Sequence, residues 1–191
     1  EAHRAGIGLA SHAQGSNGVK IALAGGVDTI EHGFFLDDGA CNLLAESGKI
    51  LVADWGILEF HIKRESFLPY QRRILQITFD EAIKSYQKAR KMGVKIAMGS
   101  HLGGNLLGKN AIQLEAMVNA GASPMEAIVS ATKIGSEAIR MQDRVGTLEA
   151  GKYADMLFVE GDPLNDITIL QKKEKIRKVI KAGEVEVDRG N

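Results

Sequence analysis

Two histidines end short apolar runs near the start of the sequence, and glycine follows each within a few residues. His12 closes the run that starts at Ile7, and His32 closes the run that starts at Val27. The spacing between the histidines fits one strand, one helix and two short loops, so we expect both at the ends of adjacent parallel strands, roughly 5 Å apart across the sheet. Imidazole is the commonest protein ligand for metals such as zinc, and the pair therefore predicts a metal site.

Polar side chains also follow the later apolar runs. Asp54 follows the third run, and His101 comes shortly after the fourth. A catalytic zinc ion has about three protein ligands and an open position for water, whose pKa it lowers to roughly 7. With His12 and His32 as ligands, either His101 or Asp54 could act as the general base of a hydrolase. An ordinary hydrogen-bonded role is the alternative for any single histidine, but histidines at several matched strand ends favour the metal site.

Apolar runs alternate with helical segments along the first 142 residues. The predicted strands cover residues 7–11, 27–31, 50–53 and 94–98. Such alternation implies an α/β fold with parallel strands and right-handed crossovers, which fits either a doubly wound sheet or part of a (β/α)8 barrel. Ligands collect at the carboxyl ends of the strands in both folds. Polar residues at the end of every strand favour half of a barrel, because an open sheet concentrates them at one crevice.

The character of the sequence changes near residue 143. Short strand-like runs, over residues 155–159 and 176–187, are joined by turns rich in glycine. We therefore expect a half-barrel over residues 1–142, which carries the metal-site histidines, and a small β extension over residues 143–191.

A long segment separates the third strand from the next predicted helix. Residues 56–76 show no clear periodicity and contain His61, for which we predict contact with substrate. A long insertion after a strand end is a typical position for a substrate lid. The capping-box pattern from Thr78 to Glu81 predicts that the following helix begins at Thr78 and ends near Met92.

Composition limits the classes of partner and location. The sequence has 191 residues and balances 24 Lys and Arg against 24 Asp and Glu, which argues against nucleic acid as a partner. No apolar run approaches the roughly 20 residues that cross a bilayer. Cys41 is the single cysteine, which excludes an internal disulfide and fits a cytoplasmic location. The sequence opens without methionine, on a pattern typical of the end of a helix, so we expect it to begin within a longer protein.

Several segments resemble the C-terminal half of the metal-dependent amidohydrolase superfamily, in the branch of imidazolonepropionase-like enzymes and Xaa-Pro and Xaa-Arg dipeptidases. They are the His12 segment and residues 26–33, 91–99, 120–128 and 146–163. The resemblance implies that His12 and His32 are metal ligands at the ends of barrel strands five and six. It also implies that the C-terminal strands belong to a β-sandwich, and that the substrate is a small peptide- or amide-like molecule.

Some family features are replaced in this sequence. The resemblance predicts Gly-Thr-Asp at the end of strand eight, with an aspartate that contacts metal and moves the catalytic proton, whereas here Gly99 and Ser100 precede His101. Relatives carry His-Gly-x-Asn in the following loop, which here reads Leu107-Gly-Lys-Asn110. The strand-one His-x-His pair and the strand-four lysine or glutamate have no counterpart in the sequence.

Two hypotheses follow. The first is a zinc-dependent hydrolase that cleaves an amide C–N bond or an ester bond, with His12 and His32 as metal ligands and His101 as ligand or base; its predicted substrate contacts are Asp54, His61 and Asn110. The second is a catalytically inactive homologue or fragment that serves binding or assembly. Four strands cannot close a barrel, so we expect either a preceding half or a homodimer of half-barrels.

Overall fold

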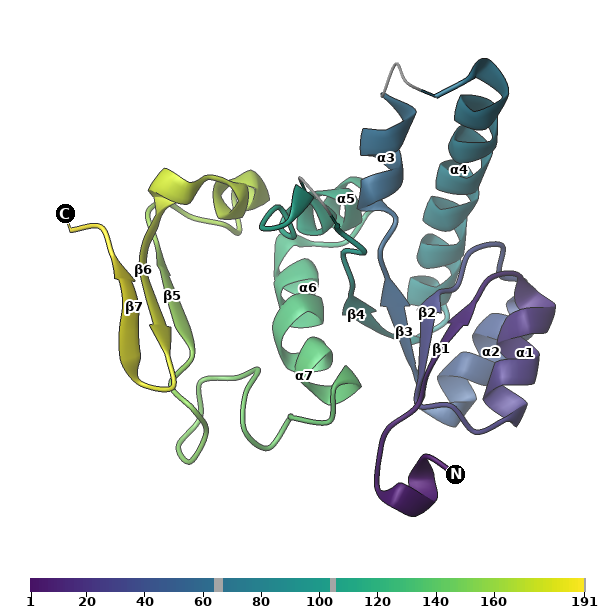
Figure 1. Ribbon diagram of the computed structural model, residues 1–191, viewed down its shortest axis with the longest axis horizontal. Helices are drawn as coiled ribbons and strands as arrows, with labels where there is room; N and C mark the ends of the chain where they lie inside the picture. The colour runs from purple at the N-terminus through teal and green to yellow at the C-terminus, as the bar shows by residue number, and fades with distance from the viewer. Residues whose placement is uncertain (64–66, 104–105, 191) are drawn as a thin grey trace.

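Four short strands form a parallel sheet in a computed structural model that describes residues 1–63, 67–103 and 106–190 (Figure 1). They are β1 (Ala10–Ala13), β2 (Thr29–His32), β3 (Ile50–Ala53) and β4 (Lys95–Met98). Their order across the sheet is the same as their order along the chain. A doubly wound sheet reverses its strand order at a switch point. The α/β half-barrel is therefore confirmed, and the doubly wound alternative is excluded.

Helices connect the strands and follow the last of them. The 3₁₀ turn His3–Ala5 precedes the sheet, and a π-helical stretch, Ser130–Ile134, joins the last two helices. The helices are α1 (Ser16–Ala24), α2 (Asp38–Ser47), α3 (Gly56–Ile62), α4 (Pro69–Lys91), α5 (Ile112–Asn119), α6 (Pro124–Val129) and α7 (Gly135–Ala138). Within the described ranges, none of these helices combines the length and apolar composition that a membrane span requires.

The strand register separates a buried face of the sheet from an inner face. Ile30 pairs with Leu51, and both are at most 1% exposed within the core that the helices cover. Paired residues of parallel strands point to the same face, and successive residues alternate between faces. His12 therefore shares the opposite, inner face with its register partner Glu31. This face corresponds to the interior of a closed barrel.

Helix α4 begins at Pro69, so the predicted helix start at Thr78 is wrong. Proline at the first helical position and the bond from the Leu68 N–H to Gln71 Oε1, at 2.9 Å, mark the true start. The Thr78 hydroxyl lies inside the helix and donates to the Ile74 carbonyl at 3.0 Å. The segment predicted as irregular thus consists largely of α3 and the first turns of α4, and its residues 64–66 lie outside the described ranges.

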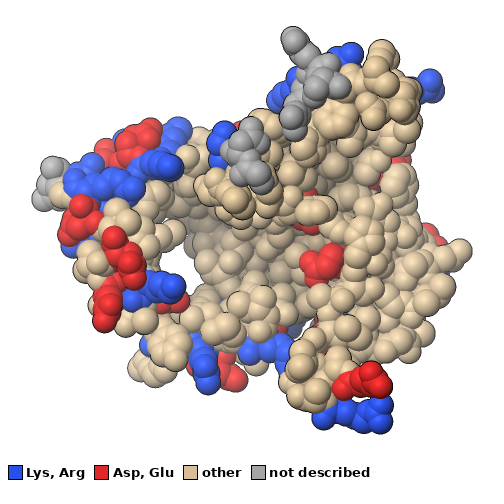
Figure 2. All heavy atoms as spheres, viewed as in Figure 1, with Lys and Arg blue, Asp and Glu red and all other residues tan. Residues whose placement is uncertain are grey.

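The C-terminal residues form a second, antiparallel sheet. Its strands are β5 (Met156–Val159), β6 (Ile176–Lys181) and β7 (Glu184–Asp188), and α6 and α7 lie between it and the parallel sheet (Figure 1). On the face shown in Figure 2, charged side chains of both signs gather over this sheet. The 3₁₀ turn Ile167–Gln171 packs on α5, and Ile167 is buried in the half-barrel core. The extension is thus anchored on the half-barrel through a short helical turn.

The start of α6 gives the first prediction, an acid-sensitive contribution to stability. Glu126 accepts hydrogen bonds from Arg90 at 2.8 Å and from the Ser123 N–H at 2.7 Å. The Arg90 bond, followed by the bonds with Ser123, lowers the pKa of Glu126 from 4.5 to about 2. Because the folded-state pKa is the lower one, this stabilisation is complete above about pH 4.5 and is lost as the pH falls towards 2.

Replacing Glu126 by glutamine should therefore reduce the dependence of the free energy of unfolding on pH between about 4.5 and 2. Urea denaturation at a series of pH values measures this dependence. Glu174→Gln is the matched control, because Glu174 is exposed. Equal pH dependence in Glu126→Gln and the wild type would show that the Arg90 pair contributes nothing.

Candidate metal centre

Strands β1 and β2 bring His12 and His32 together. Their parallel register places His12 opposite Glu31 and His32 opposite Ala13, so the two histidines are offset by one residue. His32 ends β2 in the left-handed backbone region, with φ +72°. The centroids of the two imidazole rings are 4.5 Å apart, with the rings inclined at 67°. The rings are thus about as close as the spacing of parallel strands led us to expect.

Asp54, which directly follows β3, holds the His32 ring. Nδ1 of His32 lies 3.0 Å from Oδ1 and 2.9 Å from Oδ2 of Asp54, and the side chains are only 8% and 7% exposed. With Nδ1–H donating to this carboxylate, Nε2 carries the lone pair that a metal ion requires. The shortest contacts of Asp54 are with His32. Its expected roles as a substrate contact or a base remain predictions.

His101 completes the group from the loop after β4. Its ring centroid is 5.0 Å from that of His32, and its Nδ1 is 3.8 Å from Oδ2 of Asp54. One potential ligand atom from each of these three residues lies within 4.8 Å of the others. The His101 side chain is 66% exposed, in contrast to the buried His32–Asp54 pair. His101 is therefore the member of the group that is most open to solvent.

Two supporting contacts involve Asn110, whose predicted contact with substrate remains a prediction, and Gln113, which the sequence did not single out. The Asn110 side-chain amide donates to the Ser100 hydroxyl at 2.7 Å, so Asn110 fixes the residue that precedes His101. Gln113 of α5 is 1% exposed, and its Oε1 accepts from the Gly56 N–H at 2.6 Å, two residues after Asp54. No local pattern marks Gln113, because its role depends on how α5 packs against α3.

His61 has two aromatic neighbours. It belongs to α3, and its ring centroid is 6.2 Å from that of Phe60 and 5.8 Å from that of Phe67. Among the described residues the ligand group consists of His32, Asp54 and His101, and it includes neither His61 nor His12. The predicted contact of His61 with substrate remains a prediction.

Gly99 permits the close approach of β4 to Asp54 and gives the second prediction. A Cβ atom at this position would lie 2.8 Å from Cγ1 of Val52 and 3.1 Å from Cβ of Asp54. Gly99→Ala should therefore displace Asp54 and destabilise the fold by about 1–3 kcal/mol. It should also weaken the binding of zinc offered to the candidate site. Urea denaturation and zinc titration measure the two effects.

Gly103→Ala is the matched control, since a Cβ atom there would meet nothing within 4 Å. Zinc affinity equal to that of the wild type in both glycine variants would contradict the proposed dependence of the site on Gly99.

The donor set fits a divalent transition-metal ion. Imidazole nitrogens and a carboxylate oxygen are the ligands that zinc and similar ions take in catalytic sites. The Glu31 carboxylate adds negative charge on the same inner face as His12, and it accepts a 2.7 Å bond from the Thr29 hydroxyl. The His32–Asp54 pair also has the form of the orienting pairs that support metal-bound histidines.

Residues 1–185 match the amidohydrolase family. This chain belongs to that family. The match includes all four strands of the half-barrel and the strand-end residues described above, so the family resemblance drawn from the sequence is confirmed.

Relatives of this amidohydrolase chain include several hydrolases. It is 30% identical to ochratoxinase from Aspergillus niger over 189 residues and 27% identical to imidazolonepropionase from Symbiobacterium thermophilum over 194 residues. A crystal structure of a Xaa-Pro dipeptidase with bound methionine matches 96% of the chain at 36% identity, with a TM-score of 0.85. The crystal structure of A. niger ochratoxinase matches 99% of the chain at 29% identity, with a TM-score of 0.90.

The amidohydrolase chain spans only part of these relatives. It covers 39% of the length of the ochratoxinase and 41% of that of the imidazolonepropionase. It covers 46% of the dipeptidase structure. These shares agree with a half-barrel that corresponds to part of a longer amidohydrolase fold.

Proposed function

We propose that this chain provides part of the active site of a zinc-dependent hydrolase, which cleaves an amide C–N bond or an ester bond in a small peptide- or amide-like substrate. The convergence of His12, His32, Asp54 and His101 at the ends of the four parallel strands carries the proposal. Membership of the amidohydrolase family and similarity to named hydrolases support it.

Each strand-end residue has a distinct role in this proposal. His12 and His32 hold the metal ion through ring nitrogens, and Asp54 keeps the His32 ring in the tautomer that leaves Nε2 free. A divalent ion held there would supply Lewis-acid chemistry to the scissile carbonyl and to the attacking water. His101 accepts the proton of that water and returns it to the leaving group. The Asp54 carboxylate, 3.8 Å away, stabilises the imidazolium that forms on His101.

The proposed active site needs a second half-barrel. Among the described strands, β1 and β4 each pair on one side only. Unpaired edges of a parallel sheet readily take up further strands, and a closed barrel leaves no edge. We propose that the missing strands come from another part of the same protein or from a second copy of this chain. Light scattering on the intact protein measures its molecular mass and separates the two sources.

Turnover with and without metal tests the proposal. The purified protein is incubated with a panel of Xaa-Pro dipeptides, N-acyl amino acids and carboxylic esters, before and after treatment with a chelator. We expect hydrolysis of at least one class, loss of activity with the chelator and recovery on addition of zinc. Zinc binding without hydrolysis of any member would favour the inactive homologue that serves binding or assembly.

A further inference from the structure

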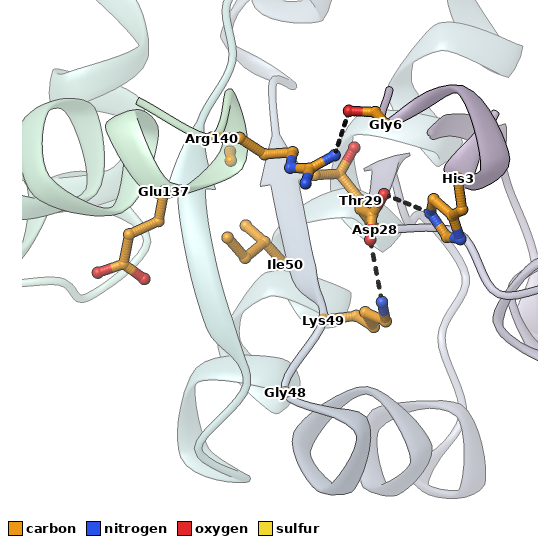
Figure 3. A pocket seen from close by; sticks show the side chains of 10 residues that line it. His3, Gly6, Asp28, Thr29, Gly48, Lys49, Ile50, Glu137 and Arg140 are labelled. Atoms are coloured by element: carbon orange, nitrogen blue, oxygen red, sulfur yellow. Dashed lines mark hydrogen bonds and ion pairs between the residues drawn. The ribbon is translucent and has the colours of Figure 1, made fainter. Parts of the chain in front are cut away.

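A pocket of about 430 Å³ opens at the end of the parallel sheet opposite to the candidate metal centre. It lies between the first residues of β2 and β3, the start of the chain and α7 (Figure 3). Its charged or ionisable lining residues are His3, Asp28, Lys49, Glu137 and Arg140. Thr29, at the start of β2, borders this pocket, whereas His32, at the end of the same strand, belongs to the metal centre. The two sites are therefore separate.

The acidic residues of the pocket are already neutralised by neighbours. Asp28 accepts bonds from the Leu9 N–H at 2.9 Å, His3 Nε2 at 2.8 Å and Lys49 Nζ at 3.1 Å. These bonds, with that of Leu9 the largest influence, hold the pKa of Asp28 well below its usual range. Glu137 forms an ion pair with Lys95 at 2.7 Å. Each of these two carboxylates therefore already has a basic partner.

Arg140 is a cation of the pocket that forms no ion pair with a carboxylate in the described part of the chain. In the described part of the chain, Nη1 of Arg140 donates a hydrogen bond to the Gly6 carbonyl at 3.3 Å. No ion pair of Arg140 with a carboxylate occurs among the described residues. A guanidinium has five N–H donors in a planar fork, so most of its donors remain available. In Figure 3 the guanidinium points across the pocket towards Gly6 and the Asp28 region.

The backbone conformation of Arg140 and the glycine at position 8 direct the Arg140 side chain into the pocket. Arg140 lies just past the end of α7 with φ +59°, a left-handed conformation for which glycine is favoured. A Cβ atom at Gly8 would lie 2.9 Å from Cδ of Arg140, so the absence of a side chain at Gly8 gives the arginine its path into the pocket. A strained backbone position at a ligand-sized pocket is a reason to look for a binding role.

We propose that this pocket binds a small oxyanion, a carboxylate or a phosphate, through the guanidinium of Arg140. Two oxygens of a carboxylate or of a phosphate can each accept a hydrogen bond from the two parallel N–H groups of one guanidinium. Lys49 lies on the same wall, and an ammonium group has three donors, of which Asp28 takes one. The proposal is independent of the hydrolytic function, because none of the metal-centre residues lines the pocket.

Isothermal titration of the intact protein with acetate, and separately with inorganic phosphate, tests this site at constant ionic strength. We expect saturable binding whose affinity falls at least tenfold in Arg140→Gln and is unchanged in Arg144→Gln. Arg144 is an exposed arginine outside the pocket lining and is therefore a matched control. Tighter binding of acetate would identify a carboxylate as the ligand, and tighter binding of phosphate a phosphate. Anion binding at the metal centre would instead have the same affinity in the wild type and in Arg140→Gln.

The Arg140→Lys variant distinguishes weaker anion binding from a loss of folding. Lysine keeps the positive charge without the bidentate fork, so its affinity should lie between those of the wild type and Arg140→Gln. All variants are compared by their thermal unfolding transitions. Equal affinity of the wild type and a folded Arg140→Gln variant, or no saturable binding of either anion to the wild type, would overturn the proposal.

Discussion

Replacing His32 by alanine should remove bound zinc and abolish hydrolysis. His32 lies at the centre of the group, with ring centroids 4.5 Å from His12 and 5.0 Å from His101. Loss of a supporting contact around a metal ligand typically lowers metal affinity about 10–100-fold, so loss of the ligand itself should lower it by more than about 100-fold. The dissociation constant for zinc and the rate of hydrolysis are the two measurements.

His3→Ala is the matched control for this variant. His3 also bonds an aspartate, Asp28, at 2.8 Å, but it lies at the opposite end of the sheet. It should retain zinc and activity, while His32→Ala should remain folded by circular dichroism. Full zinc binding by a folded His32→Ala variant would show that the strand-end histidines do not hold the metal.

Replacing Asp54 by asparagine should weaken zinc binding about 10–100-fold, the effect typical of a lost orienting carboxylate. Both Asp54 oxygens contact His32 Nδ1, and one lies 3.8 Å from His101. Asparagine keeps the shape but removes the carboxylate charge beside His101. With zinc held at saturation, kcat should therefore still fall, and KM should change less. A steady-state kinetic analysis of the zinc-saturated variant measures the two constants.

Asp38→Asn is the control for loss of a carboxylate, because Asp38 pairs with Lys88 on the surface and its side chain is 78% exposed. It should have unchanged zinc affinity and kcat. If zinc-saturated Asp54→Asn has the kcat of the wild type, Asp54 has no part in catalysis beyond holding His32.

The parallel strands could be predicted because their signals are local. Each is a short apolar run that ends in a polar residue or glycine, and the predicted segments overlap β1 to β4. The start of α4 was misplaced because a capping-box pattern at Thr78 lies inside a helix that already begins at Pro69. In the structure the Thr78 hydroxyl bonds a carbonyl of its own helix, which the sequence pattern does not distinguish from a cap.

The proximity of the candidate-site histidines could be predicted for the same physical reason. Strand spacing was enough to bring His12 close to His32, since both lie on adjacent strands. The contact between His32 and Asp54 was not predicted, because it depends on the left-handed backbone at His32 and on the close approach of Gly99. Long-range contacts such as Gln113 to Gly56, 57 residues apart, leave no local signal.

X-ray absorption spectroscopy at the zinc edge on the intact, zinc-loaded protein measures directly whether the strand-end histidines hold the metal. We expect one zinc ion per chain with at least two histidine nitrogens at about 2.0–2.1 Å. We also expect the histidine signal to disappear in His32→Ala. A protein that binds no zinc, or zinc whose coordination is the same in the wild type and His32→Ala, would contradict these expectations.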